Sequence, residues 1–177
     1  EASFEIALSE AVEVLATPAG RAAKGAGSTA GTKSAASPLF ILVSATATLE
    51  EMFACKLLAK ARPGTTLVCA RHVPDGVEDR ILRKSDRHPN TRGAELLGLR
   101  IADFTGSTGS GDAAPGAGAP PGGAVLLAVG FDYAVGASLE KYVGGFSKIV
   151  AIAARETSIS RGAHVLIPGL TFAEKDG

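Results

Sequence analysis

The chain is poor in the residues that carry metal and disulfide chemistry. Two cysteines, Cys55 and Cys69, occur among its 177 residues, and no C-x-x-C pair is present. This pattern supplies neither an iron–sulfur nor a zinc motif, and two cysteines are too few for a disulfide-rich secreted scaffold. Because both lie in apolar runs, we interpret them as buried, reduced thiols.

Long apolar runs and clusters of one charge are also missing. No run approaches the roughly 20 residues that a membrane helix needs, and no signal peptide is recognisable. The 18 Lys and Arg residues are matched by 18 Asp and Glu residues and are scattered along the chain. Since phosphate binding requires clustered cations, we expect neither nucleic-acid binding nor direct insertion into a membrane.

Hydrophobic residues make up 46% of the sequence, which is enough to build a substantial core. A domain of this length buries roughly 70% of the surface that its unfolded chain exposes. The chain starts at Glu1 without Met and stops at Gly177 after a charged turn. We therefore expect it to be one domain of a longer protein.

Five short apolar runs predict strands that are buried on both faces, as in parallel sheets. They span residues 39–43, 65–70, 124–129, 148–153 and 163–167. Helical patterns precede or separate them at residues 4–15, 48–62, 77–84, 91–99 and 138–143. This alternation predicts an α/β fold with a doubly wound, mostly parallel sheet in a Rossmann-like three-layer arrangement.

Composition divides the chain into three segments. Residues 1–18 form an N-terminal helix that Pro18 ends, and residues 19–37 are a Gly-, Ala- and Ser-rich stretch that we predict to be a flexible linker. Residues 38–177 form the α/β domain. A Gly- and Pro-rich, low-complexity loop interrupts this domain at residues 105–123.

Three glycine-rich stretches resemble phosphate-binding loops only in part. Residues 25–31 precede a strand, whereas the dinucleotide fingerprint follows a strand and opens a helix. Residues 31–34 (GTKS) lack the Walker A spacing. Residues 106–111 can cradle a phosphate through backbone N–H groups if they lie at the carboxyl edge of the sheet. A linker or a flexible loop is the simpler interpretation of all three.

Side chains suited to nucleophilic chemistry form no recognisable constellation. His72, His88 and His164 are far apart in sequence, and no G-x-S-x-G elbow occurs. Ser44 follows the first strand at the edge where open α/β sheets bind ligands, although a residue that leads into a helix is the simpler interpretation. His164 lies between apolar neighbours, which favours a strand histidine over a ligand.

Two pairs of carboxyl groups remain as candidates for general acid and base. They are Glu78 with Asp79, and Asp132 with Glu140. Solvated surface is the simpler interpretation of both pairs. We therefore assign no catalytic, cofactor-binding or metal-binding residue in this chain.

Two polar runs stand out from the composition. The first, residues 85–98 (SDRHPNTRGAELLG), is a loop fixed by Pro89 that leads into a helix beginning at Asn90 or Thr91. Gly93 in that helix permits the close approach of another backbone. The second run comprises Glu156 and Thr157 with residues 163–169 (AHVLIPG) and 172–177 (FAEKDG), and it ends a strand in a charged turn. Both are ligand-facing places, and a purely architectural role is equally compatible with them.

These runs resemble a known family. Residues 86–98 are similar to the D-x-N-P-N-x-R-G-x-x-x-L-G stretch of the large iron–sulfur subunit of NADH–quinone oxidoreductase. Residues 156–177 resemble the E-T-A…A-D-V-V-L-P-A…F-x-E-K-x-G signature of the molybdopterin-oxidoreductase superfamily, to which that subunit is related. The resemblance covers about residues 38–177.

The resemblance implies a domain of a respiratory complex I-like enzyme that passes electrons from NADH to quinone. The iron–sulfur clusters would lie elsewhere in the parent subunit, and this piece would be mainly structural and not itself catalytic. Its partners would be other subunits of the complex. It would reside in the peripheral arm, on the cytoplasmic side of the inner membrane or on the mitochondrial matrix side.

Two departures from the family pattern bear on the choice between branches. His164 stands where the family usually has Asp, and Tyr133 follows Gly130, Phe131 and Asp132 where pterin-binding members have Pro. Both departures favour the branch in which the domain has lost molybdenum and serves as a scaffold.

Two alternatives remain open. The first is the pterin-binding domain of a molybdenum or tungsten oxidoreductase such as formate dehydrogenase, whose loops at residues 90–93 and 130–133 would touch the cofactor. The second is a stand-alone nucleotide-binding or interaction module. Fold alone does not decide between these functions.

Overall fold

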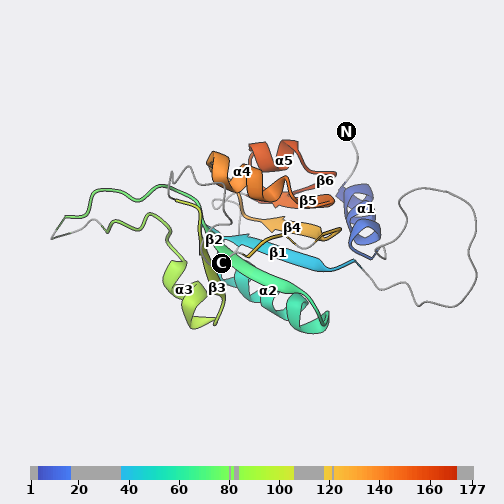
Figure 1. Cartoon of the computed structure of the whole chain (residues 1–177), viewed down its shortest axis with the longest axis horizontal. Helices are drawn as coiled ribbons and strands as arrows, with labels where there is room; N and C mark the ends of the chain where they lie inside the picture. The colour runs from blue at the N-terminus through green and yellow to red at the C-terminus, as the bar shows by residue number, and fades with distance from the viewer. Residues whose placement is uncertain are drawn as a thin grey trace, which may run out of the picture.

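The protein is a three-layer α/β domain built on a parallel sheet. The computed structural model describes residues 4–16, 37–79, 81, 84–105, 118–120 and 122–170. Within them, six strands pair in the order β3-β2-β1-β4-β5-β6, as Figure 1 shows. The strands are β1 (Leu39–Ser44), β2 (Thr66–Arg71), β3 (Arg100–Asp103), β4 (Val125–Val129), β5 (Lys148–Ala153) and β6 (Val165–Pro168). The predicted doubly wound, Rossmann-like fold class is therefore confirmed.

The central strands are buried because their side chains alternate between two separate cores. In β1, Leu39, Ile41 and Val43 face one core, and Phe40 and Leu42 face the other. Successive residues of a strand point to opposite faces of the sheet, so a strand covered on both sides must be apolar at every position. The continuous apolar runs in the sequence therefore reflect strands that are buried on both faces.

Helices cover the two faces of the sheet in separate groups. One core receives residues from α1 (Phe4–Ala16), α2 (Leu49–Ala61) and α3 (Thr91–Leu96). The other receives residues from α4 (Ala137–Val143) and α5 (Ser158–Arg161). Helices α2 and α3 connect β1 to β2 and β2 to β3, whereas α4 and α5 connect β4 to β5 and β5 to β6. The two pairs lie on opposite faces because crossovers between parallel strands are right-handed.

Helix α1 packs on β5 and β6 through small residues. Its buried residues are Ala7 and Ala11, whereas Phe4, Leu8 and Val12 are each about half exposed. These three positions are four residues apart and therefore form one apolar stripe on the outer side of the helix. Among the described residues, no helix is long and apolar enough to cross a membrane.

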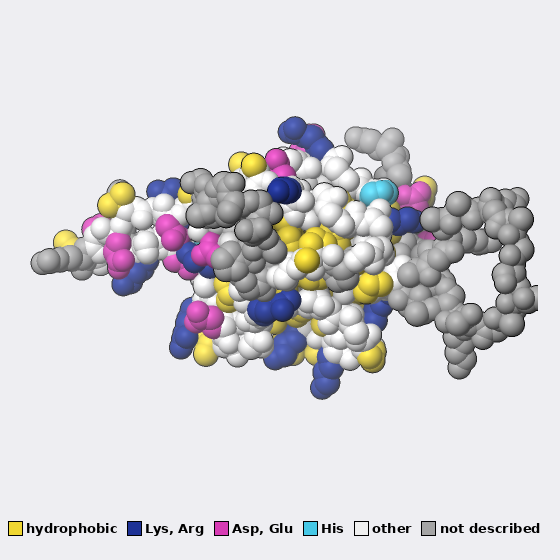
Figure 2. Space-filling model, in the orientation of Figure 1, with side chains coloured by type: hydrophobic (Ala, Val, Ile, Leu, Met, Phe, Trp, Pro, Cys, Tyr) yellow, Lys and Arg dark blue, Asp and Glu magenta, His cyan; other side chains and the backbone are white. Residues whose placement is uncertain are grey.

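The surface carries both signs of charge. Figure 2 shows acidic and basic side chains next to one another at the end of the molecule where the loop after β2 projects. This mixed surface agrees with the balanced charge of the sequence.

The structure departs from the predicted secondary structure in four places. Strand β3 has no counterpart among the predicted strands, because it is a four-residue edge strand with charged residues at both ends. Residues 77–79, 81 and 84 are not helical, so the predicted helix at residues 77–84 is wrong in its described part. The four-residue helix α5 is likewise absent from the predicted helices, and α3 ends at Leu96 rather than at residue 99.

The other predicted strands and helices are present with ends shifted by at most two residues. Several expectations fall outside the described residues. They concern residues 17–36, which include the predicted linker and the glycine-rich stretches there, residues 106–117 and 121 of the low-complexity loop, and residues 171–177.

Candidate functional site

The carboxyl edge of the sheet is the expected position of a ligand-binding site. In open α/β sheets, ligands bind outside the carboxyl ends of the strands, where neighbouring strands lead to helices on opposite faces. Here that point lies between β1 and β4, which pair directly from Leu39 with Val125 to Val43 with Val129. His88 and Asn90 of the first polar run and Thr157 of the second lie at this edge, whereas His164 lies at the opposite edge, beside the start of β5.

The turn after β1 uses its own polar groups. Ser44, buried at 0% exposure, has its Oγ 2.6 Å from the Oγ1 of Thr46, and the Thr46 N–H donates to the same Ser44 oxygen at 3.0 Å. The Thr46 hydroxyl also lies 3.3 Å from the carbonyl oxygen of Gly130, to which it donates. Thr46 therefore joins the loops after β1 and β4, and the candidate residue Ser44, the last residue of β1, hydrogen-bonds Thr46 within the turn.

Direct contact closes the crevice between these two loops. Gly130 has a φ of +74°, and a Cβ added to it would lie 2.8 Å from the Cβ of Ala47. The backbone of residue 130 thus lies against residue 47 in a way that a side chain would prevent. The place where this fold offers a crevice is filled by the protein's own backbone.

The first polar run reaches the same turn through Asn90. The Asn90 N–H donates to the carbonyl of Ala45 at 3.3 Å, and its Nδ2 donates to the carbonyl of Ala47 at 2.7 Å. Asn90 stands at the N-cap position of α3, but its side chain makes no capping hydrogen bond. Gly93, one turn later, faces the side chain of Leu49 at the start of α2. Asn90 and Gly93 therefore fix α3 against the β1–α2 connection.

His88 joins the same run to the end of β2. Its Nε2 accepts hydrogen bonds from the backbone N–H groups of His72 and Val73, both at 2.9 Å. Its Nδ1 lies 2.7 Å from Oδ1 of Asp86, which also accepts the His88 N–H at 2.9 Å. Because Nε2 is an acceptor, the geometry assigns the ring proton to Nδ1, which donates to the carboxylate.

Arg71, at the end of β2, gathers three carboxylates around His88. Its guanidinium lies 2.7 Å from Asp103, 2.7 Å from Asp75 and 3.6 Å from Asp86. Burial opposes ionisation of Asp86, but hydrogen bonds from His88 and the charge of Arg71 outweigh it and lower the pKa of Asp86. Burial likewise opposes ionisation of Asp103, but hydrogen bonds from Thr105 and the Arg71 charge lower the pKa of that carboxyl. The cluster is a set of anions held by one cation.

His72 is the exception among these polar groups. Its side chain is 2% exposed, and among the described residues neither ring nitrogen has a hydrogen-bond partner. The ring lies against Phe131 and His88, with centroids 5.1 and 5.7 Å away. Burial and the neighbouring His88 lower the pKa of His72 to about 4, although the carbonyl of Ala70 acts in the opposite direction without forming a full hydrogen bond. The folded protein therefore holds His72 as a neutral imidazole near pH 7.

The second polar run is also used within the fold. Thr157 caps α5 through a reciprocal pair of hydrogen bonds with Ser160. Asp132, after β4, accepts the Ala154 N–H at 2.6 Å and so joins the loops after β4 and β5. His164 accepts the Ile149 N–H at 3.2 Å, which agrees with its interpretation as a strand-side histidine.

The predicted acid–base pairs do not form catalytic pairs. Asp79 accepts the N–H of Ile81, and Glu78 lies 3.3 Å from Lys84 at an exposed position. Asp132 is engaged with Ala154, whereas Glu140 is exposed on α4.

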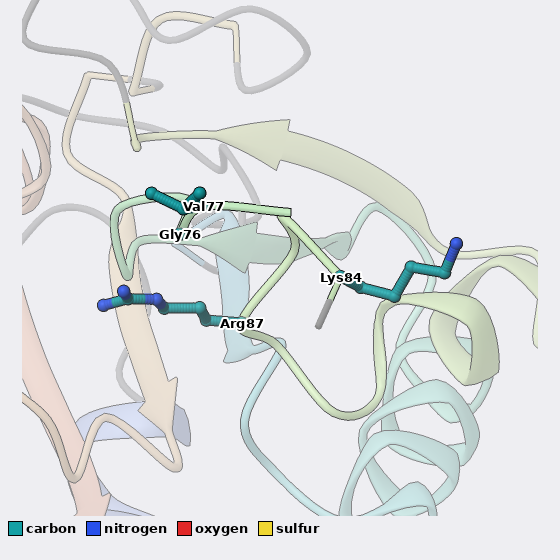
Figure 3. A pocket seen from close by; sticks show the side chains of 4 residues that line it. All are labelled: Gly76, Val77, Lys84 and Arg87. Carbon is teal, nitrogen blue, oxygen red and sulfur yellow. The ribbon is translucent and has the colours of Figure 1, made fainter. Parts of the chain in front are cut away.

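The loop after β2 borders an open cavity of about 310 Å³, lined by Gly76, Val77, Lys84 and Arg87. Figure 3 shows that the side chains of Lys84 and Arg87 extend in opposite directions and do not converge on a common point. Two cations that do not converge do not form an anion site of the kind that phosphate recognition needs. This cavity therefore does not provide a candidate site.

Cysteine and metal chemistry find no support at this edge. Both thiols are buried. Burial and the neighbouring Glu51 raise the pKa of Cys55 to about 11. Burial and the neighbouring Asp86 raise the pKa of Cys69 to about 12. In the described part of the chain, no group of three or more His, Cys, Asp and Glu side chains is placed to hold a metal ion.

Sequence reasoning missed the Arg71–Asp103 pair and the contact of His88 with His72. The first depends on β3, whose register places Arg71 beside Asp103. The second joins residues sixteen positions apart and depends on how the intervening loop folds back. A usable signal was present in Asp86 and His88, whose spacing allows the carboxylate to orient the ring.

Comparison with known proteins gives no relative: no family model, curated protein or solved structure matches this chain.

Proposed function

We propose that this chain is a structural, non-catalytic domain of the large iron–sulfur subunit of a complex I-like NADH–quinone oxidoreductase. His88 and Asn90 of the first resembling stretch and Thr157 of the second lie at the carboxyl edge, and their polar groups bind other parts of the same chain. Electrons would pass from NADH to quinone through clusters elsewhere in the subunit. This domain would shape the peripheral arm and contact other subunits.

The observation that carries the proposal is the closure of the crevice between β1 and β4. Thr46 donates to the carbonyl of Gly130, and Gly130 lies against Ala47. Asn90, from the first polar run, donates to the carbonyls of the same turn. A domain whose ligand-facing loops bind one another is suited to hold neighbouring domains in place, because its loops keep one conformation without a ligand.

Isolation of the parent complex through an affinity tag on this chain provides the first test. We expect iron and flavin to co-purify with NADH-oxidising activity, and molybdenum, tungsten and pterin to be absent. Elemental analysis and the fluorescence of an oxidised extract measure these components. Molybdenum or tungsten together with pterin would instead identify the parent as a formate-dehydrogenase-like enzyme, and an isolate without iron would refute both assignments.

A variant separates a structural role from a catalytic one. Asn90→Ala removes a hydrogen bond that joins two loops, so we expect a smaller yield of assembled complex. The NADH oxidation rate of each complex that does assemble should equal that of the wild type. A lower rate per assembled complex would show that this edge takes part in electron transfer.

A second candidate is a nucleotide-binding module, favoured by the strand order β3-β2-β1-β4-β5-β6. This is the order of dinucleotide-binding folds, whose first strand-to-helix turn is glycine-rich. Here that turn contains Ser44, Ala45, Thr46, Ala47 and Thr48 and has no glycine. A rise in the melting temperature on addition of NADH, NADPH or ATP to the isolated chain would favour this candidate, because a ligand selective for the folded state stabilises it.

A further inference from the structure

The contact between His72 and His88 joins two segments of the carboxyl edge. His72 follows β2, and His88 lies in the loop that leads into α3. The His88 ring binds the backbone N–H groups of His72 and Val73, and the two rings lie against each other at 5.7 Å. This contact fixes the loop of residues 86–90 to the end of β2.

A proton added to His72 would meet an unfavourable environment. The ring is 2% exposed and faces the ring of Phe131 and the ring of His88. Among the described residues no carboxylate or carbonyl forms a hydrogen bond with either of its nitrogens. A buried cation without a partner costs far more than a neutral ring, so protonation requires the ring to reach water.

A proton added to His88 would also oppose the contact. Nδ1 of His88 already donates to Asp86, so the new proton would go to Nε2. That nitrogen would then become a donor facing the N–H groups of His72 and Val73. Two acceptor bonds would be lost, and three donors would face one another.

The charged groups around the pair come from several elements. Arg71 lies on β2, Asp75 on the loop after it, Asp86 before α3, and Asp103 on β3. From the loop after β4, Asp132 is directed to the Ala154 N–H. Asp86 accepts the Nδ1 proton of His88 and also lies 3.6 Å from Arg71. None of these groups binds the His72 ring, which therefore has no compensating anion among the described residues.

We propose that His72 and His88 form an acid-sensitive latch that holds residues 86–90 against the end of β2 and releases them when the buried His72 ring gains a proton. The latch is a property of this chain's own loops. It does not depend on the function proposed above, and either can fail without the other.

The direction of the effect follows from the protonation states. The ordinary pKa of histidine is about 6.5, and that of His72 is lowered to about 4 in the folded state, first by burial and then by His88. Between these two pH values the open state binds a proton that the closed state does not. The open population should therefore rise by about tenfold for each unit that the pH falls, and the latch should be closed above pH 6.5.

Hydrogen exchange of the backbone amides measures the opening in the full 177-residue chain. We expect the His72 and Val73 amides to be protected at pH 7. Their protection factors, which are corrected for the intrinsic exchange rate, should fall by about tenfold per unit from pH 6.5 downwards. Amides of residues 40–43 in β1 should keep their protection over the same range, because the opening is local.

Two variants identify the trigger. His72→Phe keeps an aromatic ring beside Phe131 and removes the titrating nitrogens, so protection of the Val73 amide should persist to lower pH than in the wild type. His164→Gln provides the matched control, since His164 also accepts a backbone N–H but lies at the start of β6, away from the pair. Its exchange profile at residues 72 and 73 should match that of the wild type.

Three outcomes would overturn the proposal. The first is a protection factor at residues 72 and 73 that stays constant between pH 7 and pH 4.5. The second is loss of protection at residues 40–43 together with residues 72 and 73, which would indicate global unfolding. If His72→Phe does not fold, NMR titration of the wild-type rings decides: protonation of both rings without any change in the Val73 amide would refute the latch.

Discussion

Gly130 lies so close to Ala47 that a Cβ at residue 130 would come within 2.8 Å of the Ala47 Cβ. The atom that would be met belongs to a short side chain fixed to the backbone, which cannot rotate away. The contact joins the loops after β1 and β4 at the point where a doubly wound sheet offers a crevice to ligands. In this protein the loops after β1 and β4 contact each other directly.

Gly130→Ala should therefore lower the free energy of unfolding for two reasons. Residue 130 has a φ of +74°, which costs an L-residue about 1–2 kcal/mol. Overpacking against Ala47 adds about 1–3 kcal/mol. Gly64→Ala is the matched control, because Gly64 has a φ of +83° with nothing within 4 Å of the added Cβ. Urea unfolding should show the larger loss for residue 130, and equal losses would mean that the loops are free to separate.

Asn90→Ala should cost about 1–3 kcal/mol of stability, because it leaves the carbonyl of the buried Ala47 without its 2.7 Å donor. Ser138→Ala tests the specificity of the effect. The Ser138 hydroxyl lies 3.4 Å from the Phe104 carbonyl, near the limit of a hydrogen bond, so its removal should change stability by less than about 0.5 kcal/mol. Thermal or urea unfolding of both variants gives the comparison, and a neutral Asn90→Ala would refute the role assigned to this side chain.

The fold was predictable where apolar residues continue through a whole strand. Strands β1, β4 and β5 lie in continuous apolar runs because both faces of each are covered. Strand β3 has only Ala102 fully buried and carries Arg100 and Asp103 at its ends, so its existence depends on pairing with β2 rather than on its own composition. Helix α5, four residues long, is likewise set by the cap between Thr157 and Ser160.

The carboxyl edge was predictable in position but not in detail. Strand ends and polar runs indicated where Ser44, Asn90 and Asp132 would lie, because parallel strands share one carboxyl edge. Their partners are backbone groups of other loops, which no sequence pattern specifies. The His72–His88 contact was unpredictable for the same reason, since the described residues between Val73 and Arg87 form neither a helix nor a strand.

Arg71→Gln should lower the free energy of unfolding by about 1–2 kcal/mol at pH 7, after allowance for carboxylates that are a third to a half exposed. The pKa values of Asp86 and Asp103 are lowered in the folded state from their usual 3.8. Their contribution is thus present above pH 3.8 and is lost as the pH falls through the folded values. The difference between wild type and variant should shrink below pH 3.8.

Arg92→Gln is the control for the Arg71 measurement. Arg92 lies 2.7 Å from Glu95, but its side chain is 78% exposed, so the pair is screened by water. Urea titrations at pH 7 and at pH 3 should show almost no effect of this variant at either pH. A loss as large as that of Arg71→Gln would mean that the half-buried cluster around Arg71 has no special role.

The two thiols should be slow to react in the folded protein. The pKa of Cys55 is raised from 9.0 to about 11 and that of Cys69 from 9.0 to about 12, both chiefly by burial, so the thiolate fraction at pH 8 falls by about 100-fold and 1000-fold. Labelling with a chromogenic disulfide reagent at pH 8 should be slower by at least these factors than in guanidinium chloride.

The two thiols should also react in a fixed order, and Cys55→Ala and Cys69→Ala assign the two phases of labelling. Cys55 lies on α2 at 6% exposure and Cys69 inside β2 at 0%, so local opening of the helix should release Cys55 first. Faster labelling of Cys69 would show instead that the edge formed by β2 and β3 opens before the helix that covers it.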